Sequence, residues 1–312
     1  MITSDIADQA HQLLHEQISE WPMLRGGYES LNSIHTRSIA FDGFEIKLQF
    51  NPGRIVSSTA QTDATSIANR KCFLCGANRP PEQRALAPFG LPYLVLCNPY
   101  PIFPQHFTVA HADHRPQQIH DNFDILLTLA RDMQSQYVAL YNGPRSGASA
   151  PDHMHFQAGT RGFMPIDDEY DRLKHPVAHN NTLEIFRSNG CLRSFIALES
   201  CDRQTLLHAF GALNGFASEE EPMMNIIISF QNARWRVMIF PRRKHRPSFY
   251  FAAGDEKILL SPAAVEMGGV CTLPIKRDFD RLTRDHVVQM YDEVCIAPNE
   301  LDALCERAAR IV

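Results

Sequence analysis

The segment that most restricts how this chain can fold is residues 152–157, in which two histidines and a glutamine alternate with apolar residues. Successive side chains of a strand point to opposite faces, so His153, His155 and Gln157 share one face. The intervening methionine and phenylalanine face a core, and the polar face presents two imidazoles and an amide to a ligand. An edge strand with two surface histidines has the same pattern, so the rest of the chain must decide.

Composition excludes several classes of protein. The chain has 312 residues, of which 44% are hydrophobic and 21% charged, as in a globular protein with a large core. Its formal net charge of −5 argues against a general nucleic-acid binder. Charged residues and histidines interrupt residues 1–20, and no apolar run reaches 18 residues. We therefore expect no signal peptide, no membrane span and a cytoplasmic location.

Cysteine usage indicates reduced thiols and one motif. The eight cysteines are irregularly spaced, which does not suggest a disulfide framework. Cys72 and Cys75 form a Cys-x-x-Cys pair, which is half a zinc site, a redox pair or a coincidence. A redox pair usually starts a helix, whereas a segment rich in glycine, asparagine and proline follows here, which favours half a zinc site.

The first half of the chain predicts alternating strands and helices. A helix is expected over 4–21, and Asp42-Gly43 predicts a hairpin between 38–41 and 44–50. Three further strands are expected over 93–97, 106–111 and 137–141, and an amphipathic helix over 117–133. A loop of small residues follows over 142–150.

The second half predicts a weaker copy of the first. Its expected elements are strands over 183–186, 194–198, 225–230 and 235–240, and helices over 203–216, 278–294 and 299–311. The sequence at the end of the strand before Pro247 is similar to the sequence at the end of the strand before Pro116, which suggests an internal duplication. We expect an N-terminal helix and lead-in (1–37), a catalytic half (38–175) and a second half without the histidine pair (176–312), joined in one body.

These segments together resemble a known superfamily. His106-Phe107-Thr108-Val109, then His114, a helix and the alternating segment 152–157 are similar to the histidine-triad proteins, whose strand–helix–strand unit binds a nucleotide phosphate. The resemblance implies an α/β fold of the α+β type, with two histidine-triad-like halves and antiparallel sheets flanked by helices. Hydrolases of the superfamily have a third histidine where this chain has Gln157, and nucleotidyltransferases and phosphorylases have glutamine.

Within that branch, segments 141–157, 225–240 and 261–266 resemble the GDP-hexose phosphorylases, which act on GDP-L-galactose or GDP-glucose. More distantly the chain is similar to diadenosine tetraphosphate phosphorylases and galactose-1-phosphate uridylyltransferase. The cysteine pair resembles the zinc half-site of the uridylyltransferases. That resemblance implies a structural Zn²⁺ and no organic cofactor, with ligands Cys72, Cys75, His114 and His153.

His155 is the expected nucleophile. An imidazole with a pKa near ~6.5 is partly neutral at pH 7 and can attack an α-phosphorus without a strong base. Attack forms a nucleotidyl-histidine and releases a sugar 1-phosphate, and inorganic phosphate then removes the nucleotidyl group. A phosphate leaves with little protonation, so the amide of Gln157 suffices to hold the non-bridging oxygens.

Other residues are candidates for binding the phosphates. Arg145 and the backbone of the loop with Gly147 and Ser149 precede the catalytic strand. Arg54 lies in a loop expected over 51–59, whose amides and hydroxyls can also hold a phosphate, although an ordinary Ser/Thr-rich loop has the same composition. The basic run with Arg242 and Lys244 is either a phosphate site or a solvated turn. The resemblance implies that Asn142 holds the ribose, and Glu266 has no assigned role.

The sequence thus predicts a nucleoside-diphosphate-sugar phosphorylase whose partners are a nucleotide sugar or dinucleotide and inorganic phosphate, with no nucleic acid and no membrane. The alternatives are a diadenosine polyphosphate phosphorylase, a hexose-1-phosphate uridylyltransferase and a non-catalytic nucleotide-binding protein. Binding alone needs no nucleophile, which argues against the last. The chain is expected to be a monomer, as an internal pseudo-dimer, or a homodimer.

Overall fold

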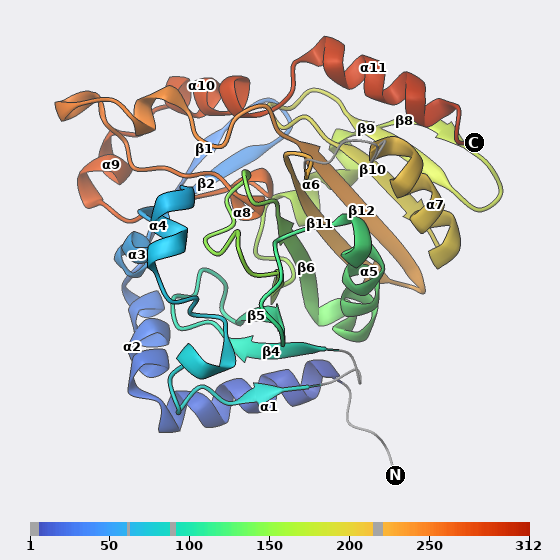
Figure 1. Cartoon of the computed structure of the whole chain (residues 1–312). Helices are drawn as coiled ribbons and strands as arrows, with labels where there is room; N and C mark the ends of the chain where they lie inside the picture. The colour runs from blue at the N-terminus through green and yellow to red at the C-terminus, as the bar shows by residue number, and fades with distance from the viewer. Residues whose placement is uncertain (1–5, 61–62, 88–91, 215–220) are drawn as a thin grey trace.

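The computed structural model describes residues 6–60, 63–87, 92–214 and 221–312 (Figure 1). The helices are α1 (Ile6–Glu20), α2 (Pro22–Ser30), α3 (Ile55–Ser58), α4 (Ala64–Asn69), α5 (Phe123–Asp132), α6 (Ile166–Leu173), α7 (Arg203–Asn214), α8 (Ala264–Met267), α9 (Lys276–Arg281), α10 (Arg284–Val294) and α11 (Pro298–Ala309). The strands are β1 (His35–Ala40), β2 (Glu45–Phe50), β3 (Ala85–Leu86), β4 (Tyr93–Cys97), β5 (His106–His111), β6 (Tyr137–Asn142), β7 (His155–Thr160), β8 (Lys174–His179), β9 (Glu184–Ser188), β10 (Ile196–Ser200), β11 (Met224–Gln231), β12 (Arg234–Pro241) and β13 (Val270–Leu273).

One ten-stranded antiparallel sheet spans both halves of the chain, in the order β3-β4-β5-β7-β6-β11-β12-β10-β9-β8. The order is symmetric about β6 and β11, where Asn142 lies opposite Asn225. In both halves a helix, α5 or α7, connects the second strand of the unit to the third. The expected α/β fold with two similar antiparallel halves is confirmed. In this symmetric order β12 occupies the position in the second half that β7 occupies in the first. The sequence similarity had instead suggested that β12 corresponds to β5, the strand before Pro116.

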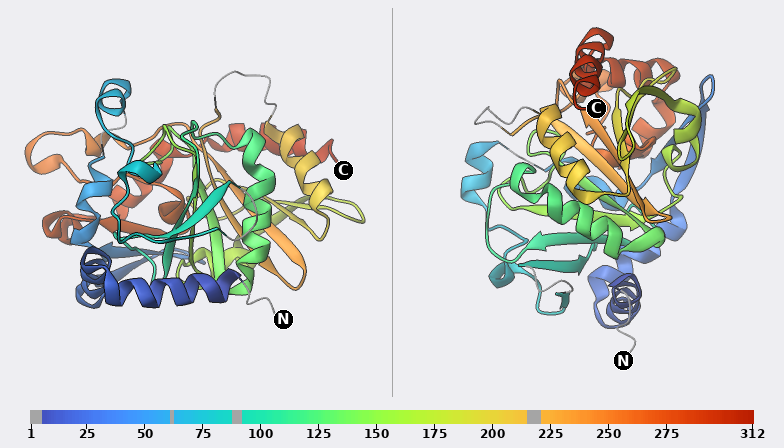
Figure 2. Two further views of the ribbon diagram at one scale, coloured as in Figure 1. Left: turned by 60° about the horizontal axis from the view of Figure 1, so that its bottom comes forward. Right: turned by 90° about the vertical axis from the view of Figure 1, so that its right-hand side faces the viewer.

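Two hydrophobic cores cover the two faces of this sheet. On one face, Met154 and Phe156 pack with residues of α1, α5, α7 and α11. On the other face, the small sheet β1-β2-β13 and helices α6, α8, α9 and α10 form the second core. Figure 2 shows α5 and α7 side by side along one face. The expected alternation holds for His155 and Gln157, which fall on the face away from α5. β7 begins only at His155, so His153, which was expected on the same strand face, lies just before the strand.

The small sheet connects the N-terminal hairpin with the C-terminal half of the chain. Gly43 has φ +78° and lies in the turn between β1 and β2, as the Asp-Gly signal predicted. β13 pairs with β2 in parallel, so a strand of the C-terminal half completes the sheet started by the N-terminal hairpin. All eight cysteines are free, as expected. Within the described residues, none of the helices has the length and apolar character needed to cross a bilayer.

Three predicted elements differ from the structure. The helix expected over 117–133 begins only at Phe123, and the loop expected over 51–59 contains the short helix α3. The helix expected over 278–294 is divided into α9 and α10, because Leu282 is extended and Thr283 caps α10 through its hydroxyl. Residues 4–5 of the first predicted helix and 215–216 of the predicted helix over 203–216 lie outside the described residues.

Candidate active site and metal cluster

His155 is held in a single tautomer by its own strand. Its Nδ1 lies 2.8 Å from the carbonyl oxygen of His153, which can only accept, so Nδ1 carries the proton. Nε2 therefore keeps its lone pair. The residue is 3% exposed, and this burial lowers the pKa of His155 to about 4. The imidazole is thus neutral at pH 7, the form that attacks phosphorus.

Gln157 is oriented by a neighbouring histidine. The Nδ1 of His106 accepts the backbone N–H of Ile102 at 3.2 Å, so its proton is on Nε2. That Nε2 donates to the Oε1 of Gln157 at 2.9 Å. Burial lowers the pKa of His106 to about 3 and keeps it neutral. The amide nitrogen of Gln157 is consequently left to donate to a ligand.

Gln117 fixes the backbone at His155. Its Oε1 accepts the N–H of His155 at 2.8 Å. Its Nε2 donates to the carbonyl oxygens of His155 and Asn142, each at 2.9 Å. This buried side chain comes from the segment that was expected to be helical, but Gln117 lies before the helix, and its amide contacts the backbone of β7.

A cavity of about 830 Å³ opens beside His155 and Gln157. It extends to the apolar side chains of Met23, Val56 and Phe73. The short helices α3 and α4, which Figure 1 shows next to each other, contribute part of its lining. Its size and mixed lining suit a nucleotide.

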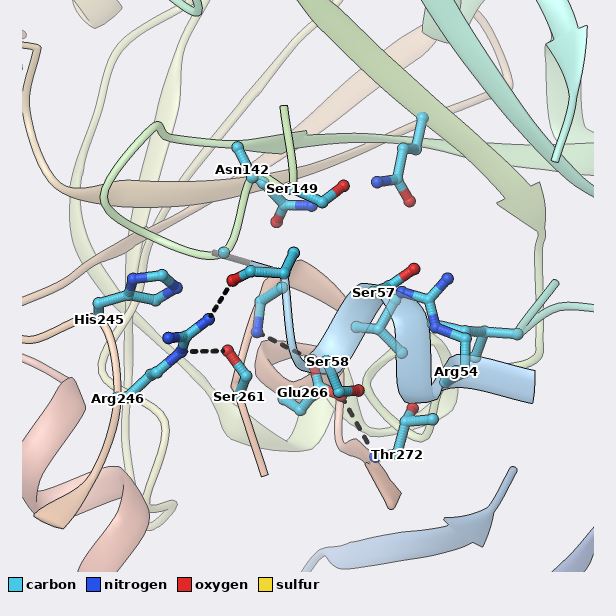
Figure 3. Close-up of a pocket in the computed structure, with 17 residues that line it drawn as sticks. Arg54, Ser57, Ser58, Asn142, Ser149, His245, Arg246, Ser261, Glu266 and Thr272 are labelled. Carbon is cyan, nitrogen blue, oxygen red and sulfur yellow. Dashed lines mark hydrogen bonds between the residues drawn. The ribbon is translucent and has the colours of Figure 1, made fainter. Parts of the chain in front are cut away.

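A second, smaller cavity adjoins the first and contains two guanidinium groups. Arg54, Ser149 and Gln157 line both cavities. Arg54 and Arg246 reach the smaller one from opposite sides (Figure 3). Arg246 donates to the hydroxyl of Ser261 and Arg54 to a carbonyl oxygen. In the described part of the chain neither guanidinium forms an ion pair with a carboxylate, which leaves positive charge for an anionic ligand.

The walls of the smaller cavity join the two halves. The Oδ1 of Asn142 accepts from Asn225 and from the backbone of Ala264, both at 2.8 Å. Gly147 has φ +101°, and an added Cβ would lie 2.6 Å from the Cβ of Ala263. Glu266 accepts backbone N–H groups, and burial raises its pKa. These contacts fix the loop that carries Ser149.

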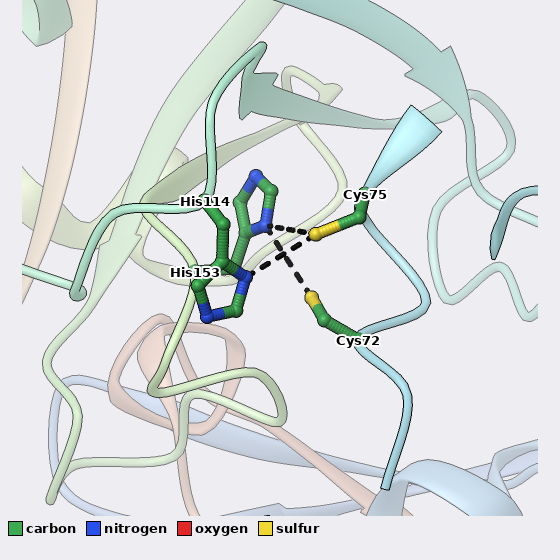
Figure 4. A group of neighbouring side chains, drawn as sticks. All are labelled: Cys72, Cys75, His114 and His153. Atoms are coloured by element: carbon green, nitrogen blue, oxygen red, sulfur yellow. Dashed lines mark hydrogen bonds between the residues drawn. The ribbon is translucent and has the colours of Figure 1, made fainter. Parts of the chain in front are cut away.

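The predicted metal ligands form one cluster. The ligand atoms of Cys72, Cys75, His114 and His153 all lie within 4.8 Å of one another (Figure 4). The sulfur of Cys72 is 3.3 Å from the Nδ1 of His153, and that of Cys75 is 3.2 Å from the Nδ1 of His114. Ligands of one tetrahedral zinc ion are separated by roughly 3.5 Å, so these two sulfur–nitrogen distances are close to what such an ion needs, and two thiols with two imidazoles are a donor set that could bind it.

The surroundings support a metal at this cluster. The Nε2 of His153 donates to the carbonyl oxygen of His111 at 2.8 Å, which directs Nδ1 toward the sulfurs. Burial opposes ionisation of the Cys72 thiol, but the adjacent His153 imidazole in its protonated form prevails and lowers the pKa of Cys72 to about 6. A thiolate is the form that binds metal.

Three predicted binding residues are not among the described residues that line either cavity. Arg145 is exposed and donates to the carbonyl oxygen of Glu221. Arg242 is buried and donates to Asn225 and to four carbonyl oxygens. Lys244 is exposed and pairs with Glu293 at 3.2 Å. Of the basic run, Arg246 is the cation that lines the cavity.

Sequence reasoning missed His106, Gln117 and Arg246 as site residues. The serines at 57 and 58, which line the smaller cavity, stood in the loop whose hydroxyls were considered for phosphate binding. His106 was part of the quoted strand motif, but its contact with Gln157 depends on the pairing of β5 with β7. Arg246 stood in the same basic run as Arg242 and was not distinguishable from it. Gln117 gave no signal, because it sits in a segment with helical periodicity.

Comparisons with known proteins agree with this architecture. Residues 13–160 match a domain of unknown function (DUF4922), and residues 176–311 match the model "GDPGP1-like, C-terminal domain". No curated protein matches the chain.

Solved structures with the same fold include two complexes of the yeast Ap4A phosphorylase Apa2. The complex with AMP has a TM-score of 0.57 at 17% identity and covers 90% of this chain and 93% of the yeast chain. The complex with Ap4A has the same TM-score and identity and covers 90% and 95%. The chain therefore shares its fold with the yeast enzyme over nearly its whole length.

Proposed function

We propose that this protein is a phosphorylase that transfers a nucleoside monophosphate group through His155 to inorganic phosphate. The observation that carries the proposal is the fixed tautomer of His155, which leaves Nε2 unprotonated beside the amide of Gln157. A binding protein needs neither a desolvated neutral imidazole nor an oriented amide donor next to it.

The reaction has two displacements at the same phosphorus. The lone pair of His155 Nε2 forms a bond to the α-phosphorus, and the bond to the bridging oxygen breaks with its electron pair on the departing phosphate. An oxygen of inorganic phosphate then attacks, the phosphorus–nitrogen bond breaks, and His155 returns to its neutral form. The His153 carbonyl accepts Nδ1–H throughout and stabilises the positive charge on the imidazole in the intermediate.

The anion-binding groups fit this sequence of steps. The Gln157 amide donates to the non-bridging oxygens, while Arg54 and Arg246 bind the leaving and the incoming phosphate in the smaller cavity. The hydroxyls of Ser57, Ser58 and Ser149 also line that cavity. Asn142 supports the loop there through Asn225 and Ala264, with its amide at the cavity wall.

Two substrate classes fit the site. The "GDPGP1-like" match over 176–311 supports a nucleoside-diphosphate hexose. The common fold with a yeast enzyme solved in complex with Ap4A supports a dinucleoside polyphosphate equally well. Both substrates place a nucleoside in the larger cavity and a phosphate leaving group in the smaller one.

Trapping of the covalent intermediate tests the mechanism. Protein incubated with α-phosphate-labelled GDP-glucose or Ap4A, without phosphate, should retain label and lose it when phosphate is added. His155→Asn should retain none, whereas His208→Asn, at an exposed position of α7, should behave like the wild type. Phosphorus NMR of the products then distinguishes the substrates. Hydrolysis that does not need phosphate would contradict the proposal.

We further propose that Cys72, Cys75, His114 and His153 bind a structural Zn²⁺. When bound, such an ion contributes folding free energy on the order of 10 kcal/mol. Metal analysis should give one zinc per chain for the wild type and for Cys201→Ser, an exposed control, and less for Cys72→Ser. A wild type purified without chelators that carries no metal would refute the assignment.

A further inference from the structure

The two residues between the cysteines of the cluster both face the substrate cavity. Phe73 and Leu74 line the same cavity as His155 and Gln157. A nucleotide whose α-phosphorus lies at His155 must place its base elsewhere in this continuous space. The loop of the metal cluster is therefore one of the surfaces available to the base.

Exposed apolar side chains are among the residues that line this cavity. Phe73 is 49% exposed, Met23 49% and Val56 56%, and all three line it. Large apolar groups left uncovered within a single cavity are typical of a ligand site. A flat nucleobase covers such a surface, because bases pack on aromatic rings.

The loop is separate from the two large cores of the protein. Cys72 and Leu74 are buried only in a small cluster with Leu96, Ala110 and Ala150. Within the loop, Asn78 donates to the carbonyl oxygen of Cys72 at 2.9 Å. So small a core provides little packing energy, which leaves the thiol–imidazole cluster as the main constraint on the position of Phe73.

The aromatic ring is also connected to the catalytic strand. The guanidinium of Arg70 lies 5.3 Å from the centre of the Phe73 ring and pairs with Asp152 at 2.5 Å. Asp152 directly precedes His153, a cluster residue whose carbonyl oxygen orients His155. The same short segment thus positions the nucleophile and one wall of the cavity.

From this arrangement we propose that Phe73 is the stacking surface for the nucleobase, and that metal on the cluster sets nucleotide affinity by holding Phe73 in place. The inference rests on the proposed function, since it places the base of the same substrate. It assigns the cluster a part in substrate binding in addition to its structural part.

Binding measurements without turnover test the stacking surface. Calorimetry, or the fluorescence of the cavity residue Trp21, would follow GMP, AMP and ribose 5-phosphate. Phe73→Ala should weaken binding of at least one mononucleotide about tenfold, leave ribose 5-phosphate unchanged and keep its metal. Phe73→Tyr should restore the affinity. Phe251→Ala, at a 70% exposed ring outside both cavities, is the matched control.

Removal of the metal with a chelator tests the second part. The metal-free protein should lose at least as much mononucleotide affinity as Phe73→Ala, with its circular dichroism retained. If the metal-free protein unfolds, the His114→Asn variant is measured in its place. The His114 side chain is 48% exposed, so its replacement disturbs little packing, and three ligands of the cluster remain. That variant should bind both metal and mononucleotide more weakly.

Three results would overturn the inference: wild-type affinity in Phe73→Ala, an equal loss for ribose 5-phosphate, or wild-type affinity in folded protein with weakened metal binding. Labelling of His155 despite any of these would leave the proposed function standing. Binding that depends on Phe73 without labelling would remove the proposed function alone.

Discussion

The Nε2–H of His106 donates to the Oε1 of Gln157 across 2.9 Å, and this contact decides which end of the amide faces the substrate. Without it the amide could turn its oxygen toward the phosphate, where two acceptors would repel each other. His106 is completely buried and lies on β5, next to the catalytic strand. We assign it as a positioning residue.

His106→Ala should lower kcat about tenfold to a hundredfold and change KM little, because the Gln157 amide then rotates between two orientations. Steady-state kinetics with the preferred substrate measures this, and His106→Asn should recover part of the loss. An unchanged kcat in the alanine variant would show that Gln157 is oriented by other groups.

His106 should also make folding stability depend on pH. Its pKa is about 3 in the folded chain against an ordinary 6.5, so between these values the unfolded state binds more protons. The contribution of His106 to the free energy of unfolding should therefore be fully present above about pH 6.5 and fall as the pH decreases, by at most about 1.4 kcal/mol per pH unit. Urea denaturation at pH 7 and 5 should show a smaller fall for His106→Gln.

Arg246→Ala should raise the KM for phosphate about tenfold, because it removes one of the two guanidiniums of the smaller cavity. Labelling of His155 before phosphate is added should be affected less. Arg243→Ala is the control, since this neighbouring arginine is exposed and bonded to the carbonyl of Asp292. Equal effects in the two variants would argue against a phosphate site.

Gly147→Ala should destabilise the protein by about 1–3 kcal/mol, because the residue has φ +101° and the new Cβ meets Ala263. Gly211→Ala in α7 has open space around it and should stabilise by up to about 1 kcal/mol. Thermal and urea denaturation compare the two. The Gly147 variant should also bind phosphate more weakly, since the displaced loop carries Ser149.

The part of the site within one strand could be predicted from the sequence. Strict alternation places His155 and Gln157 on one face whatever the tertiary structure. The Cys72/Cys75 pair was a local motif, whereas the resemblance to the uridylyltransferases implied its two histidine partners. The tautomer of His155 could not be predicted, because it depends on the distance to a backbone carbonyl.

The contacts between the two halves could not be predicted from the sequence. Arg242 and Arg246 stand in one basic run, and only their tertiary contacts distinguish them. Arg242 meets carbonyl oxygens of Pro262 and Val294, whereas Arg246 reaches the carbonyl oxygen of Ala60 in the first half. Such pairings between distant segments leave no local pattern.

The strand pair β6 and β11 makes the two halves a covalent counterpart of a symmetric dimer. Two identical subunits must carry every substitution twice, while fused halves can diverge independently. One half carries His155, the proposed nucleophile, and the other supplies Arg246, so the proposed chemistry does not share the symmetry of the sheet. Active-site titration should accordingly find one labelled histidine per polypeptide, and no cooperativity need arise between equivalent sites.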